Sequence, residues 1–239
     1  MPNEAVGDHI GLKHLWQLQE QAFSYNCQQS RPLQDALGLL DRSVRLNLSI
    51  LTAMRFGAAK QTVIRVLAAD ALSRIIVAAR IGIWGALPEC LSVLRGATES
   101  CAQLTLTVSQ NLYETALQEI NGKKLVRLKF EAVCKDLGEL GTAFRRRHSK
   151  MSDLAAHATA SSLRQAEYRK DGESYDRLGA AESPRNAEIA TSECLEYLAL
   201  VAVATLDAYS KDAIEEVWLA TLSELNLSHG ALKNQISAT

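Results

Sequence analysis

Residues 58–110, AAKQTVIRVLAADALSRIIVAARIGIWGALPECLSVLRGATESCAQLTLTVSQ, decide the fold class. In residues 58–84 the apolar side chains recur at helical spacing. They form one stripe, which contains Ile64, Leu67, Ala68, Ala71, Leu72, Ile75, Ala78 and Ala79. Gly85 and Pro88 follow as a short turn, and Pro88 suits the first turn of a second helix. Two long helices joined by a tight turn pack as an antiparallel hairpin. This stretch therefore predicts an all-α protein.

The remaining sequence extends this hairpin into a bundle. Four prolines and 5% aromatic residues fit helices better than a β-sandwich or barrel. A first helix is expected from Asp8 to about Cys27. Ser30 is a candidate N-cap, followed by Pro32, for a second helix that runs to Gly57.

Further along the chain, the basic segment 123–141 has apolar residues at helical spacing, and Gly138 and Gly141 end or break it. Residues 169–187 are expected to form a surface loop, because they are rich in Gly, Ser, Asp and Pro. A last long helix, or a broken pair, is expected over 188–225. We predict one antiparallel helical-bundle domain of about five to seven helices over residues 1–239. Its N-terminal helices are 8–56, and its core is 58–165 and 188–225.

Charge is distributed unevenly, although the net charge is only -1. Lys123 to Lys150 holds nine basic residues against three acidic, whereas Lys170 to the end holds five against twelve. One interpretation is a basic surface for phosphates, with RNA as a candidate partner; the other is two segments that face each other within the fold or across a dimer.

Several classes of protein lack support in the sequence. The five cysteines are odd in number and include no C-x-x-C pair, so neither a disulfide framework nor a zinc ribbon is indicated. Buried free thiols in a reducing compartment are expected instead. Nucleotide-binding and hydrolase motifs are absent. Charged residues interrupt the apolar runs, and no signal peptide is evident. We therefore expect a cytoplasmic protein with no membrane partner, no cofactor and no metal.

The best candidate site is KMSDLAAHATASSL, residues 150–163. Ser152 could cap a short helix with Asp153 in its first turn. His157 would lie near the end of that helix, among alanines that permit close approach of another helix. A buried, hydrogen-bonded structural imidazole is one interpretation, and a catalytic general acid/base is the other.

Two other groups of residues are candidates for binding. Arg95 and Glu99 lie four apart on the second helix of the hairpin, either as a weak exposed pair or enclosed where they could orient His157. The run FRRRHSK contains Arg145, Arg146, Arg147 and His148, followed by Lys150. Such a run forms either a solvated face or a phosphate-binding patch.

These segments resemble bacterial helical-bundle proteins of the HEPN-like type. Those proteins combine a small-x-x-A-x-x-L-x-R-x-x-x-E helix with a Y-x-x-L-S-x-x-x-H-x-S segment, and the likeness covers residues 60–210. The resemblance implies an antiparallel bundle that commonly dimerises, with Arg95, Glu99, Ser152 and His157 at matching positions. HEPN ribonucleases carry an arginine and a histidine with four to six residues between them. Here no arginine has that spacing, and Lys150 stands before His157 instead.

Three hypotheses of function follow. The first is an HEPN-like homodimer without a complete catalytic motif, which acts as an interaction or regulatory module, with a protein partner. The alternative is a metal-independent ribonuclease. In it His157 would be the general acid/base, Lys150 or Arg145–Arg147 would stabilise the phosphate, and Asp153 or Glu99 would orient the imidazole. The third is a small ligand held between helices.

Overall fold

The computed structural model describes residues 12–122, 129–156, 167–170, 173–176, 183–209 and 214–238. The predicted all-α class is confirmed. The described residues form nine helices, so the count of five to seven is not confirmed. They are α1 (Leu12–Gln29), α2 (Arg31–Ala53), α3 (Ala58–Ile83), α4 (Leu87–Ser109), α5 (Tyr113–Ile120), α6 (Phe130–Asp136), α7 (Gly138–Ala156), α9 (Pro184–Leu206) and α10 (Glu216–Ala238).

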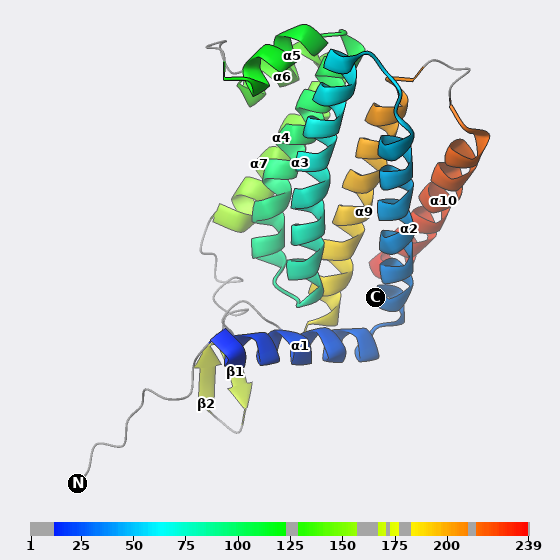
Figure 1. Ribbon diagram of the computed structural model, residues 1–239. Coiled ribbons are helices and arrows are strands. Elements are labelled where there is room, and N and C mark those ends of the chain that lie inside the picture. The colour runs from blue at the N-terminus through cyan, green and yellow to red at the C-terminus, as the bar shows by residue number, and fades with distance from the viewer. Residues whose placement is uncertain are drawn as a thin grey trace.

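Helix α9 lies at the centre of the bundle (Figure 1). It packs against α2, α3, α4 and α10, while α7 packs along α4. Helix α1 crosses the end of the bundle where the α3–α4 turn lies, and the short helices α5 and α6 lie at the opposite end. By length and composition α9 could cross a membrane, but 67% of its most apolar window is buried inside the structure. Its apolar character is therefore explained by its central position.

The predicted hairpin of α3 and α4 is confirmed. Gly85 adopts a φ of 82°, which favours glycine, and its N–H donates to the Gly82 carbonyl at 2.8 Å. Pro88 lies in the first turn of α4, as expected. Gly82 also sets how closely α3 and α9 approach, because a Cβ on it would lie 2.4 Å from the Cβ of Ala190.

The predicted cap of α2 is confirmed too. The backbone N–H of Leu33 donates to Ser30 Oγ at 2.9 Å, and that hydroxyl donates to Glu188 Oε1 of α9 at 2.5 Å. On the other side of the same joint, Asn26 Nδ2 of α1 donates to the Ile83 carbonyl at 3.1 Å. These contacts tie the α1–α2 corner to the ends of α3 and α9.

Buried thiols are also confirmed within the described residues. Cys90, Cys101, Cys134 and Cys194 are buried and free, and Cys27 is free and half-buried. Burial raises the pKa of Cys101 to about 12, and the nearby Asp70 carboxylate adds to that shift. These side chains therefore behave as small apolar core residues.

The predicted break at Gly138 is confirmed, because α6 ends at Asp136 and α7 begins at Gly138, whose φ is 61°. Gly141 does not break the helix, since α7 continues through it. Residues 123–128 of the basic segment lie outside the described residues. The C-terminal helix is the broken pair of the two alternatives, α9 and α10, but its predicted end at 225 was wrong, because α10 continues to Ala238.

Part of the expected loop over 169–187 is an antiparallel pair of strands. β1 (Glu167–Lys170) and β2 (Glu173–Asp176) pair with Tyr168 opposite Tyr175. Tyrosine favours strands, so local preference outweighs the polar composition here. The same expected loop ended too late, because α9 already begins at Pro184.

Candidate functional site

The structure brings most of the predicted site residues onto two packed helices. Arg145, Arg146, Arg147, His148, Lys150 and Ser152 lie on α7, and Arg95 and Glu99 lie on α4. Asp153 lies in the last turn of α7. His157 lies outside the described residues. Glu99 therefore lies next to the basic run of α7, whereas its predicted contact with His157 falls outside the described residues.

Glu99 pairs with His148 rather than with Arg95. Glu99 Oε1 lies 3.0 Å from His148 Nε2, and the imidazole lies against the ring of Phe130 at a centroid distance of 4.5 Å. The expected Arg95–Glu99 pair was wrong: Arg95 is exposed and makes no ion pair within the described residues. An arginine that precedes a glutamate by four residues is the weaker orientation on a helix, and α7 offers Glu99 another partner.

Arg147 connects α7 to the central helix. Its guanidinium donates to Glu196 Oε1 of α9 and lies over the ring of Tyr197 at 5.7 Å. Lys233 Nζ of α10 donates to the other carboxylate oxygen of Glu196 at 2.8 Å. Burial alone would raise the pKa of Glu196, but the hydrogen bond from Lys233 and the charges of Arg147 and Lys233 lower it overall. The basic and acidic segments therefore face each other here, as the second interpretation of the charge distribution predicted.

The other cations of the basic run face solvent. Arg145 Nε donates to Glu131 Oε2 at 2.7 Å on the surface, while Arg146 and Lys150 are exposed. Exposed ion pairs of this kind contribute little to stability. Arg146 and Lys150 thus leave positive charge exposed on α7, two residues before and after His148 and therefore on another face of the helix.

The predicted helix cap at Ser152 was wrong. α7 runs unbroken from Gly138 to Ala156, and Ser152 Oγ donates to the His148 carbonyl at 2.8 Å inside that helix. Serine makes this bond to the preceding turn when the helix continues through it. The Ser152 hydroxyl therefore bonds within its own helix and does not cap one.

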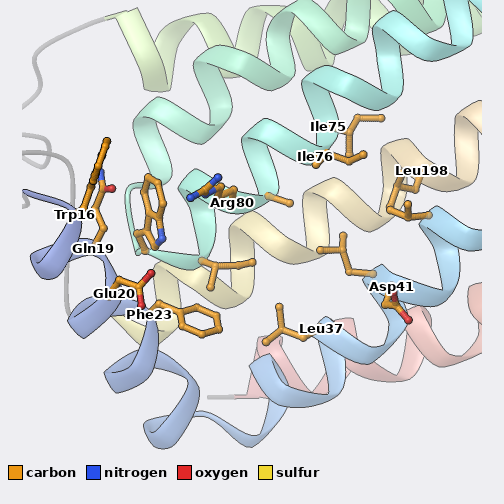
Figure 2. A pocket seen from close by; sticks show the side chains of 15 residues that line it. Trp16, Gln19, Glu20, Phe23, Leu37, Asp41, Ile75, Ile76, Arg80 and Leu198 are labelled. Carbon is orange, nitrogen blue, oxygen red and sulfur yellow. The ribbon is translucent and has the colours of Figure 1, made fainter. Parts of the chain in front are cut away.

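A second candidate site lies at the other side of the bundle, and sequence reasoning missed it. A groove of about 720 Å³ opens between α2 and α3, has α9 as its floor and is bounded by α1 (Figure 2). We call it the α2–α3 groove. It is lined by Trp16, Gln19, Glu20, Phe23, Leu37, Leu40, Asp41, Val44, Ile75, Ile76, Ala79, Arg80, Ile83, Trp84 and Leu198.

Water reaches much of the apolar wall of this groove. Trp16 is 62% exposed, Phe23 39% and Ile76 47%. Leu198, in the floor, is fully buried and belongs to the core. Large apolar side chains gathered around a concave surface are typical of binding sites. The sequence signal that could have revealed it was the mixed apolar spacing of residues 12–23, which leaves aromatic residues off the buried stripe.

The described residues contain no group of three His, Cys, Asp or Glu side chains that could hold one metal ion. No family model matches the chain, and no curated protein or solved structure matches it. The two candidate sites therefore rest on geometry and chemistry alone.

Proposed function

We propose that the protein is an interaction or regulatory module that acts by binding, with the α2–α3 groove as its binding surface. The groove itself carries this proposal: its volume of about 720 Å³ and its apolar, aromatic lining suit an apolar group of a partner or ligand. Burial of Trp16, Phe23 and Ile76 by such a group would remove apolar area from water. This gives a favourable free energy of binding.

The HEPN-like relationship and a homodimer are part of the same proposal. They are supported by the resemblance over residues 60–210 and by the packed α3–α4 hairpin that carries Arg95 and Glu99. A bacterial source is proposed from the resemblance alone. The buried free thiols, Cys90, Cys101, Cys134 and Cys194, support a cytoplasmic location, because reducing compartments keep thiols free.

Binding of the neutral fluorescent dye Nile red tests the groove. Ile76 lines the groove at 47% exposure, whereas its neighbour Val77 is 50% exposed and lies outside it. A carboxylate in an apolar site is costly to desolvate, so we expect Ile76→Glu to weaken dye binding about tenfold or more. Val77→Glu, the matched control, should bind like the wild type. Equal binding by all three proteins, or none by the wild type, would contradict the proposal.

A ribonuclease is the second candidate function, and the His148–Glu99 pair favours it. A carboxylate that holds an imidazole nitrogen at 3.0 Å fixes the orientation of the ring, as a general acid/base requires. Arg146 and Lys150 on the same helix supply exposed positive charge for a phosphate. His148 therefore joins His157 as a candidate base for metal-independent cleavage.

Cleavage of a labelled, mixed-sequence RNA separates these candidates. For the enzyme we expect wild-type cleavage, and a loss of about 100-fold or more in whichever of His148→Gln or His157→Ala removes the general acid/base. Circular dichroism at matched concentration checks that both variants are folded. Cleavage that survives in both variants excludes both histidines as the base. No cleavage by the wild type removes the enzyme hypothesis and leaves the binding module.

A further inference from the structure

Three charged side chains line the α2–α3 groove, and they differ in how they are paired. Asp41 accepts from Arg45 Nε at 2.9 Å on the exposed face of α2. Figure 2 shows Asp41 at one end of the groove, with Leu198 and Ile75, whereas Glu20, Trp16 and Arg80 lie toward the other end. The Asp41 carboxylate is thus neutralised locally and lies far along the groove from Arg80.

Arg80 is the cation of the groove. Its guanidinium carbon lies 5.6 Å from the centroid of the Trp84 ring, which presents its face to the charge. The groove-lining residues around it on α3 are the apolar Ile76, Ala79 and Ile83. Within the described part of the chain Arg80 takes part in no ion pair. A planar guanidinium held on an aromatic ring keeps its N–H fork available for a carboxylate.

The dimensions of the groove favour a compact ligand over a long partner helix. On α3 its lining runs from Ile75 to Ile83, which at 1.5 Å per residue is about 12 Å. Helix α1 crosses the bundle at that end and contributes Trp16, Gln19, Glu20 and Phe23 to the lining (Figure 1). A helix of several turns could not continue past α1, whereas a ligand of small-molecule size fits the volume.

We propose that the α2–α3 groove binds a small amphipathic carboxylate, with its carboxylate on Arg80 and its apolar body between α2 and α3 over Leu198. This inference rests on the proposed function, because it assigns a ligand class to the same groove. The exposed Glu20 lies at the Arg80 end and would instead attract an ammonium group, so the charge of the ligand is the property to test.

Calorimetric titration with three probes of equal chain length tests the ligand class. The probes are dodecanoate and cationic dodecyltrimethylammonium, both below their micellar concentrations, and neutral dodecanol below its solubility limit. We expect dodecanoate to bind about tenfold or more tightly than dodecanol. Arg80→Gln should remove that advantage and leave dodecanol binding unchanged. Arg95→Gln is the matched control, since Arg95 is also an exposed helical arginine, without an ion pair in the described residues and outside the groove.

The outcomes separate this inference from the proposed function. Equal affinity for dodecanoate and dodecanol overturns the carboxylate assignment, but it keeps the groove as a binding surface. Preference for dodecyltrimethylammonium overturns it in favour of Glu20. An advantage for dodecanoate that survives Arg80→Gln places the carboxylate elsewhere and also overturns it. If none of the probes binds and Nile red does not bind either, both proposals fail.

Discussion

At the scale of single residues, buried polar groups connect the helices by specific pairs. Tyr197 is fully buried and shares a hydrogen bond of 2.7 Å with Thr98. Burial raises the pKa of Tyr197 to about 12, although Thr98 and the charge of Arg147 lower it in part. The phenol therefore stays neutral at every physiological pH. Its role is to join α9 to α4 with a satisfied hydrogen bond.

His229 makes the stability of the α9–α10 contact sensitive to pH. Its Nε2 lies 3.0 Å from Ser192 Oγ, and it faces Lys233 and Glu196. Burial lowers the pKa of His229 below 6.5 and the charge of Lys233 lowers it further, whereas Glu196 and Ser192 oppose these shifts in part. The unfolded chain then binds the proton first, so stability is greatest above pH 6.5 and declines as the pH falls through the folded-state pKa.

Thermal unfolding of the wild type and His229→Gln checks this effect. We expect the midpoint of the wild type to fall more between pH 7 and pH 5 than that of the variant, because glutamine can still bond to Ser192 but takes up no proton. The other titrating groups are common to both proteins and cancel in the comparison. Parallel pH profiles would show that His229 does not titrate within this range.

At the scale of elements, small residues decide which helices approach closely. Gly82 and Ala190 let α3 and α9 meet, and Ala78 and Ala79 of α3 and Ala97 of α4 are also buried. Small side chains at an interface allow backbones to pack tightly. Helix α1 is different, because it crosses the end of the bundle and buries few apolar residues, among them Ala22. Because α1 crosses the bundle in this way, Trp16 and Phe23 stay exposed and line the groove.

At the scale of the whole molecule, the proposed homodimer predicts a mass, and exposed apolar side chains of α10 are candidates for its interface. On α10, Val217 is 61% exposed, Leu219 50% and Leu227 75%. Association that covers such residues would be favourable. In sedimentation velocity we expect a species of twice the 26.1 kDa of one chain. A single-chain mass at every protein concentration would remove the dimer and leave the groove proposal intact.

The local sequence determined that the chain is helical and where several of its helices begin or turn. The apolar stripe from Ile64 to Ala79, the cap at Ser30 and the turn at Gly85 act between residues a few positions apart, and all three predictions were confirmed. The all-α class follows from them. The errors at Ser152 and in the 169–187 segment were also local. A serine hydroxyl can cap a helix or bond to the preceding turn, and a short polar stretch can form a loop or a strand pair.

Only the tertiary structure decided the partners across helices. Glu99 meets His148 49 positions away, Arg147 meets Glu196 of α9, and Trp16 and Arg80 line one groove from α1 and α3. Periodicity states which face of a helix is apolar, but the rotation and offset of one helix against another come from how side chains interlock. For that physical reason the sequence predicted a bundle, whereas the groove and the His148–Glu99 pair emerged only when the helices were packed.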